Sequence, residues 1–337
     1  MSDTVLEVRN LRKIFEVSRS FFETIQRRTP QAVIAVDDVS FNINRYETLG
    51  LVGESGCGKS TLGRCILRLY EPTSGNIFFE GEDITHKSQK ELRPIRRKMQ
   101  VVFQDPYSSL NPRMTVRQTI SEVLQFHNIC TREDEERYIN DLLQMVGLDK
   151  STAAKYPRSF SGGQRQRIGL ARTLAVRPNF IIADEPVSAL DVSIQAQILN
   201  LLEDLRRELG LTMLFIAHEL SVVKHISSRV AVMYLGKIVE IGTTDEVFNQ
   251  SLHPYTEGLL KALPRPVASR RKRKPAIAGD IPSPLNLPSG CRFHPRCPIA
   301  EDICRSTPPP LRSVSPTHQV LCQLRPSPDW SAQNEQR

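Results

Sequence analysis

Apolar residues in this chain gather into short continuous runs that alternate with longer amphipathic stretches. The runs TLGLV (48–52), FIIA (180–183) and TMLFIA (212–217) predict buried strands, because a strand covered on both faces is apolar throughout. The stretch IQAQILNLLEDLRREL (194–209) carries apolar residues at helical spacing and predicts an amphipathic helix. Strands interleaved with helices predict an α/β fold with a largely parallel sheet.

Hydrophobicity also bears on where the protein works. No apolar run approaches the ~18 residues that a membrane-spanning helix needs. The start of the chain, MSDTVLEVRNLRK, is charged early and lacks the apolar core and small-residue cleavage site of a secretory signal. We therefore expect the protein to work in the cytosol.

Composition changes near residue 264. The 337 residues carry a net charge of +8, but residues 264–337 hold 12 Lys and Arg against 5 Asp and Glu, together with 14 of the 23 prolines. This break predicts a main domain at 1–263 and a small, irregular, Pro- and Cys-rich C-terminal domain at 264–337. Because the positive charge belongs to the tail, we do not expect a nucleic-acid partner. The basic run RRKRK (270–274) favours a solvated linker over a membrane contact.

A phosphate-binding motif follows the first predicted strand. The segment GESGCGKST (53–61) fits G-x-x-x-x-G-K-[ST], with a strand before it and a helix expected from about Lys59. Such a loop turns backbone N–H groups toward phosphate oxygens, and its lysine reaches the β- and γ-phosphates. Ser60 is the expected Mg²⁺ ligand. The predicted ATP-binding residues of this loop are Gly53, Glu54, Ser55, Gly56, Cys57, Gly58, Lys59, Ser60 and Thr61.

Two carboxylates follow the second predicted strand, in NFIIADEP. Asp184 is placed to hold Mg²⁺, and Glu185 to orient and deprotonate the attacking water. An exposed acidic turn is the simpler alternative, but it leaves the apolar run before it unexplained. Together with the loop, these residues predict a nucleoside-triphosphate hydrolase.

Three further segments narrow the family: SGGQRQR (161–167), SALD (188–191) and His218 after TMLFIA. With these the chain resembles the ATP-binding cassette (ABC) ATPases of membrane transporters. The resemblance implies a P-loop ATPase core with a helical subdomain at about 107–178. It also implies that the SGGQ motif binds the nucleotide of an opposite subunit, which gives Ser161, Gly162, Gly163 and Gln164 as further ATP-binding residues.

The same resemblance assigns four more site residues. Gln104 in VVFQDP would sense Mg²⁺ and the attacking water, Asp191 would cross the dimer interface, and His218 would contact the γ-phosphate. Phe15 is the expected adenine-stacking aromatic, although the family more often has tyrosine there. An insertion at 16–31 separates it from the following strand and offers Phe21 or Phe22 as alternatives.

Longer segments, among them FQDPYSSLNPR (103–113), HPYTEGLL (253–260) and IPSPLNLPSGCRFHPRCP (281–298), resemble the dipeptide/oligopeptide importer ATPases. The likeness is strongest to the dipeptide-type subunit that pairs with a second ATPase. It implies two membrane permease subunits as partners, an extracytoplasmic peptide-binding protein that acts indirectly, and a peripheral place on the cytoplasmic face of the inner membrane.

Other functions stay open. The same branch transports nickel, glutathione and some sugars, and a homodimer is possible. A soluble cassette ATPase acting on nucleic acid is disfavoured because the chain has one phosphate loop and one signature motif. An adaptor that uses nucleotide only as a structural ligand is disfavoured because Glu185 and His218 are both present.

Four of the seven cysteines lie in the tail: Cys291, Cys297, Cys304 and Cys322. A cytosolic protein keeps few stable disulfides, which leaves metal binding or free thiols. The tight C-x₂₋₄-C pairs of zinc sites are absent. We therefore hypothesise a four-cysteine [4Fe–4S] cluster, with Zn²⁺ as the alternative. His294 and His318 are near enough in sequence to substitute as ligands, but loop histidines without that role are the favoured interpretation.

Overall fold

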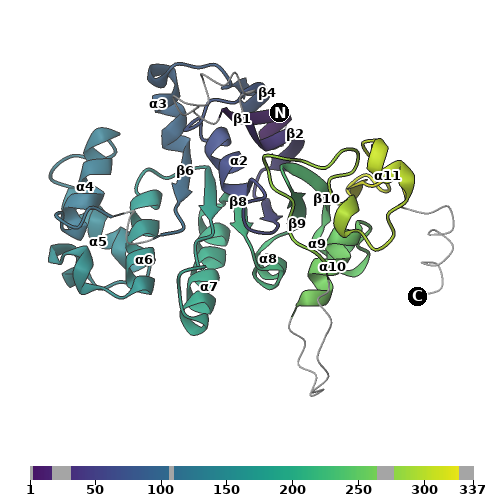
Figure 1. Cartoon of the computed structure of the whole chain (residues 1–337). Helices are drawn as coiled ribbons and strands as arrows, with labels where there is room; N and C mark the ends of the chain where they lie inside the picture. The colour runs from purple at the N-terminus through teal and green to yellow at the C-terminus, as the bar shows by residue number, and fades with distance from the viewer. Residues whose placement is uncertain (1–2, 17–31, 106–109, 264–276, 326–337) are drawn as a thin grey trace, which may run out of the picture. The chain divides into compact units, whose positions relative to one another are not determined.

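The computed structural model describes residues 3–16, 32–105, 110–263 and 277–325 (Figure 1). The described residues divide into two compact units. Unit 1 holds the described residues in 1–6, 42–48 and 79–217, and unit 2 holds those in 7–41, 49–78 and 218–337. Four strands have residues in both units: β1 (Thr4–Glu16), β2 (Ala32–Asn44), β4 (Ser74–Phe79) and, by its first residue alone, β3 (Thr48–Val52). Strands β1, β2 and β4 form one sheet with β5 (Glu82–Asp83), in the order β2-β1-β4-β5.

Unit 1 contains three parallel strands and a group of helices. The strands are β6 (Met99–Val102), β7 (Phe180–Asp184) and β8 (Thr212–Ala217). The helices are α3 (Gln89–Lys98), α4 (Val116–Phe126), α5 (Glu135–Met145), α6 (Gly162–Leu174) and α7 (Val192–Leu209), with short 3₁₀ turns η1 (Lys150–Ala154) and η2 (Pro157–Ser159). Strand β7 pairs in parallel with β6 on one side and β8 on the other. Every residue of β7 and β8 is buried, as expected for parallel strands covered on both faces.

Unit 2 contains the phosphate-loop strand and most of the C-terminal half. Strand β3 (Thr48–Val52) pairs in parallel with β9 (Arg229–Tyr234), which pairs antiparallel with β10 (Lys237–Thr243). The helices are α2 (Lys59–Ile66), α8 (Leu220–Ile226), α9 (Thr244–Asn249), α10 (Pro254–Ala262) and α11 (Asp302–Ser306), with a 3₁₀ turn η3 (His294–Arg296).

The described part of the tail packs onto unit 2 as additional strands. Strand β12 (Gln319–Leu321) pairs antiparallel with β10 and with β11 (Leu311–Ser313). Buried Glu240 of β10 accepts hydrogen bonds from the backbone N–H groups of Leu252 and His253, at 2.7 and 3.0 Å, and its Oε1 lies 2.8 Å from Nε2 of His318. These contacts fasten the tail to the main sheet by a buried polar network.

The strands predicted at 48–52, 180–183 and 212–217 and the helix predicted at 194–209 are confirmed, and the structure extends that helix to Val192. The domain boundary at 264 and the helical subdomain at 107–178 stay predictions. The basic run 270–274 and the insertion, including Phe21 and Phe22, lie outside the described residues. Across the described ranges no helix is long and apolar enough to cross a membrane.

Candidate ATP site

The predicted site draws its residues from both units. The phosphate loop, Phe15 and His218 belong to unit 2, whereas Gln104, Asp184, Glu185, the signature motif and Asp191 belong to unit 1. Each half has its own geometry.

The phosphate loop leaves β3 at Gly53 and enters α2 at Lys59. Its backbone needs glycine at Gly58, which has φ 108° and where an added Cβ would lie 2.1 Å from the carbonyl oxygen of Ala35. The Lys59 ammonium is buried and donates to the carbonyl oxygens of Gly53 and Glu54, at 2.8 and 3.2 Å. The lysine is therefore already held at the loop, and phosphate oxygens would compete with these carbonyls for its protons.

The Cys57 side chain of the loop has little chemistry of its own. Burial raises the pKa of the Cys57 thiol in spite of the neighbouring Lys59 charge, so Cys57 stays protonated near neutral pH. Its carbonyl oxygen accepts a 2.8 Å hydrogen bond from the backbone N–H of Gly236, in the β9–β10 turn. Cys57 thus contributes backbone rather than side-chain contacts.

The carboxylate half of the site stands at the end of β7. Asp184 ends the strand and is buried. Glu185 follows with φ 48°, an unusual conformation for a non-glycine residue, and its backbone N–H donates to the Ile216 carbonyl at 2.9 Å. Gln104 Nε2 donates to Glu185 Oε2 at 2.8 Å. The structure thus brings together the predicted base and the predicted water-sensing glutamine.

The signature motif begins α6. Ser161 is the N-cap: its Oγ accepts from the Gln164 backbone N–H at 3.3 Å, and Gln164 Oε1 accepts from the Ser161 backbone N–H at 3.1 Å. An added Cβ at Gly163 would lie 2.4 Å from the Ile194 side chain, so glycine permits the close packing of α6 on α7. Ser161 and Gln164 are exposed. A helix N-terminus presented to solvent in this way suits an anion carried by a partner.

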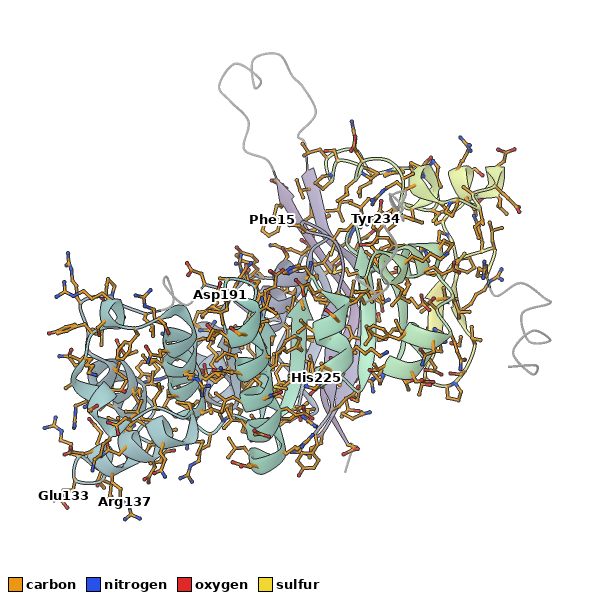
Figure 2. The ribbon with its side chains drawn as sticks, turned by 90° about the horizontal axis from the view of Figure 1, so that it is seen from below. Phe15, Glu133, Arg137, Asp191, His225 and Tyr234 are labelled. Carbon is orange, nitrogen blue, oxygen red and sulfur yellow. The ribbon has the colours of Figure 1, made fainter. Side chains whose placement is uncertain are left out.

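Two further predicted residues, Asp191 and His218, stand next to α7 and β8 in the chain. Asp191 is the exposed N-cap of α7 (Figure 2). His218 directly follows β8, is about half exposed, and has Nε2 3.5 Å from Glu219 Oε1.

Phe15, the predicted adenine-stacking residue, already contacts another aromatic ring. Phe15 lies near the end of β1 (Figure 2), with its ring 5.4 Å from Tyr70 in an edge-to-face arrangement and the Lys13 ammonium 4.9 Å above it. Sequence reasoning missed Tyr70, which follows α2 and has no motif of its own. It also missed Tyr255 and Arg296, which contact the phosphate loop; both lie in segments that served only as family markers.

The four tail cysteines are free thiols close enough to influence one another. Burial is the main cause that raises the pKa of Cys291, Cys297 and Cys322, and the charge of Cys304 raises it further in each. The pKa of Cys297 rises to about 11. However, among the residues that the structure describes, no group of three or more His, Cys, Asp or Glu side chains is arranged to hold a metal ion. The structure thus supports neither the [4Fe–4S] hypothesis nor the zinc alternative.

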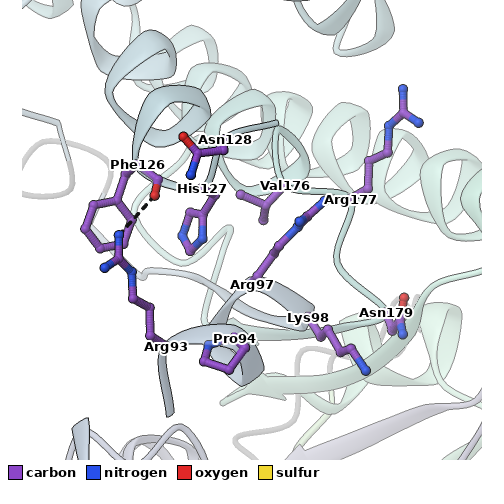
Figure 3. A pocket seen from close by; sticks show the side chains of 10 residues that line it. All are labelled: Arg93, Pro94, Arg97, Lys98, Phe126, His127, Asn128, Val176, Arg177 and Asn179. Carbon is purple, nitrogen blue, oxygen red and sulfur yellow. Dashed lines mark hydrogen bonds between the residues drawn. The ribbon is translucent and has the colours of Figure 1, made fainter. Parts of the chain in front are cut away.

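A separate basic cavity of about 670 Å³ lies in unit 1, between α3, the end of α4 and the segment after α6 (Figure 3). Arg93 donates to the Phe126 carbonyl at 3.2 Å, and its guanidinium lies 4.2 Å above the Phe126 ring. Burial lowers the pKa of His127, and the charges of Arg97 and Arg93 lower it further, so this histidine is neutral at pH 7. None of the described residues that line the cavity is acidic. The lining residues are Arg93, Pro94, Arg97, Lys98, Phe126, His127, Asn128, Val176, Arg177 and Asn179.

Two family models and several known proteins match this chain. Residues 36–188 match the ABC transporter family model, and residues 239–304 match the model of the oligopeptide/dipeptide transporter C-terminal region. The oligopeptide transport ATP-binding protein AppF of Bacillus subtilis is 50% identical over 96% of this chain and 98% of its own. The probable peptide ABC transporter ATP-binding protein y4tS of Sinorhizobium fredii is 51% identical over 96% of this chain and 91% of its own.

Solved structures show the same fold. The ATP-binding cassette MJ0796, in a dimeric post-hydrolysis state bound to ADP and Pi, is 28% identical with a TM-score of 0.62, over 71% of this chain and 98% of its own. CbiO1 from Clostridium perfringens, part of an ABC transporter complex, is 28% identical with a TM-score of 0.62, over 74% and 92% of the two chains. The chain therefore belongs to the ATP-hydrolysing ATP-binding proteins of ABC transporters, in the oligopeptide/dipeptide branch.

Proposed function

We propose that this ATPase lies on the cytoplasmic face of the plasma membrane and powers the import of di- and oligopeptides into the cell. The observation that carries the catalytic part is the 2.8 Å hydrogen bond from Gln104 to Glu185. This contact supports Glu185 as the carboxylate base and Gln104 as the residue that reports on the nucleotide. The cargo is supported by the match to the oligopeptide/dipeptide C-terminal region and by the names of the two relatives, which are peptide transport proteins.

The roles of the site residues follow from their positions. Lys59 and the backbone of the phosphate loop bind the β- and γ-phosphates, and Ser161 with its helix N-terminus binds the γ-phosphate held by a partner cassette. Glu185 accepts the proton of the attacking water after Gln104 has given up its hydrogen bond to Glu185, which frees the carboxylate to face the bound nucleotide. Ser60, Gln104 and Asp184 would hold Mg²⁺, which supplies charge neutralisation at the phosphates. His218 and Asp191 complete the site across the paired cassettes.

The expected assembly contains a second, related ATPase, two membrane permeases and a peptide-binding protein outside the membrane. Co-expression with candidate permeases and a peptide-binding protein tests the cargo directly. Peptide-loaded binding protein should stimulate ATP hydrolysis by the reconstituted transporter several-fold. Stimulation by nickel, glutathione or a sugar, with none by peptide, would replace peptide as the proposed cargo by that substrate.

We propose that the basic cavity of unit 1 receives a carboxylate from a membrane permease. The support is its charge: Arg93 and Arg97 are close enough to lower the pKa of His127, and no described lining residue is acidic. Arg93→Glu combined with Arg97→Glu should abolish co-purification with the permeases while ATP binding by the isolated chain persists. Arg137→Glu, at an exposed arginine on α5 (Figure 2), is the matched control. Retained co-purification in the double variant would remove this assignment.

We also propose that the four tail cysteines ligate an iron–sulfur cluster. The support is that the four thiols are free and that their charges act on one another's pKa, as thiols that share one site would. Anaerobically purified protein should contain iron with matching acid-labile sulfide, and Cys304→Ser should lose both. Stoichiometric zinc, or no metal, would reject the cluster and leave the ATPase function unaffected.

A further inference from the structure

The cysteine-bearing segment reaches the phosphate loop through one arginine. Arg296 ends η3, next to Cys297, and donates from Nη1 to Glu54 Oε2 at 2.7 Å and from Nη2 to Glu54 Oε1 at 2.9 Å. This two-point pairing joins residues 242 positions apart in the sequence. The Arg296 side chain is 5% exposed and that of Glu54 is 23% exposed, so water screens the pair only partly.

The backbone of the same loop residue is held from a second direction. The Tyr255 hydroxyl accepts a 2.9 Å hydrogen bond from the backbone N–H of Glu54. Tyr255 is fully buried near the start of α10, and burial raises the pKa of its hydroxyl, so it stays protonated. Side chain and backbone of Glu54 are therefore both fixed by residues from the C-terminal third of the chain.

An aromatic cluster connects the two residues that contact Glu54, Arg296 and Tyr255. Phe293 of the tail is 2% exposed, and its ring centroid lies 5.4 Å from Tyr255 and 5.3 Å from Tyr234. The Arg296 guanidinium lies 5.9 Å above the Tyr234 ring. Because these rings interlock, a displacement of the tail segment would move Arg296 and Tyr255 together.

A second arginine anchors the neighbouring turn. Arg292 donates to the Asp37 carboxylate and to the Leu235 carbonyl oxygen. The next residue, Gly236, donates its backbone N–H to Cys57 of the phosphate loop at 2.8 Å. The loop is thus supported at Glu54 and at Cys57 by contacts that lead back to the cysteine-bearing segment.

We propose that Arg296 is a positioning residue for the phosphate loop, through which the C-terminal segment sets the affinity of the ATPase for nucleotide. The inference rests on ATP binding at this loop but goes beyond it, because ATP hydrolysis could occur without any dependence on the tail. A purely structural salt bridge is the competing explanation. It predicts that breaking the pair lowers stability and leaves nucleotide affinity unchanged.

The test is the affinity of the full chain for a fluorescent ATP analogue, with KM and kcat for ATP measured alongside. Arg296→Ala should weaken binding and raise KM about tenfold, with kcat changed less than about twofold, because the loop loses pre-organisation rather than its catalytic groups. Arg305→Ala removes an exposed arginine of the same segment, 67% exposed, and should change neither value. Arg296→Lys keeps the charge without the two-point geometry and should fall between the two.

A double-mutant cycle isolates the pair. Glu54→Gln should weaken binding to a similar extent, and Arg296→Ala combined with Glu54→Gln should be no worse than either alone. Tyr255→Phe keeps the ring and removes the hydroxyl, so it tests the second hold if Arg296→Ala fails to fold. Unchanged affinity in folded Arg296→Lys and Tyr255→Phe, or fully additive effects in the cycle, would overturn the proposal. Absence of ATP turnover in the unaltered protein would instead contradict the proposed function.

Discussion

The two elements that we propose to face phosphate are held in opposite ways. The loop at 53–61 is supported by residues far away in the sequence, Arg296, Tyr255 and Gly236. The signature at the start of α6 is stabilised by its own capping box, and its Ser161 and Gln164 are exposed. A loop that binds the chain's own nucleotide benefits from being pre-formed, whereas a surface that meets a partner's nucleotide must stay accessible. The comparison indicates where changes will affect binding within one chain and where they will affect only the paired state.

The largest effect is expected at the base, which belongs to neither element. Glu185→Gln keeps the shape and the contact with Gln104 but removes the proton acceptor, so turnover should fall at least ~100-fold while ATP binding persists. Size-exclusion chromatography with ATP should show more closed dimer, either with itself or with the second ATPase. Near-normal hydrolysis in this variant would remove Glu185 as the base.

Lys59→Ala should separate nucleotide binding from the support of the phosphate loop by distant residues. The variant loses the charge-assisted hydrogen bonds to phosphate, worth about 1.5–3 kcal/mol, so nucleotide affinity should fall by roughly 10- to 150-fold. The fold of the loop should persist, because Arg296 and Tyr255 still hold Glu54. Isothermal titration with ATP measures the loss. Unimpaired ATP-driven uptake would contradict the role of Lys59.

Ser161→Asp tests the locally held element. Aspartate is as good an N-cap as serine, so the unfolding midpoint should shift by no more than about 2 °C. Its negative charge would face the partner's γ-phosphate, so ATP hydrolysis by the assembled pair should fall about 100-fold. Ser161→Asn, an uncharged cap, is the matched control and should retain more activity. Equal activity in the two variants would show that this helix end does not meet a phosphate.

The smallest predicted effect is a pH dependence of folding stability that arises at His253, next to Tyr255. Burial lowers the pKa of His253 to about 4, although the charge of Glu240 opposes the shift, and His253 Nδ1 accepts from the Tyr255 backbone N–H at 3.1 Å. Since the unfolded histidine titrates near 6.5, folding stability from this group is complete above that pH and falls between about 6.5 and 4, by up to about 3 kcal/mol.

His253→Asn provides the check on this pH dependence, because asparagine can still cap α10 but does not titrate. Its thermal midpoint should drop less than that of the unaltered protein between pH 7.5 and 5.5. Parallel curves for the two proteins would show that His253 does not carry the effect.

Features set by local pattern were predictable from the sequence. Strand β3, Gly58 and Lys59 follow from the loop motif, and the α6 start follows from SGGQ because Ser161 and Gln164 form a capping box within four residues. The pairing of β12 with β10 and the contact of Arg296 with Glu54 have no such signal, since each joins distant segments through packing. The positive φ of Glu185 could not be predicted from the sequence either, because tertiary contacts rather than residue type keep the backbone in this conformation.

The most direct test compares the two elements in one assay: binding of a fluorescent ATP analogue to the isolated chain, before any partner cassette is present. We predict that Arg296→Ala weakens binding about tenfold, whereas Ser161→Asp and Arg305→Ala leave it unchanged. Unchanged binding in folded Arg296→Ala would contradict this prediction, because the loop would then not depend on the tail.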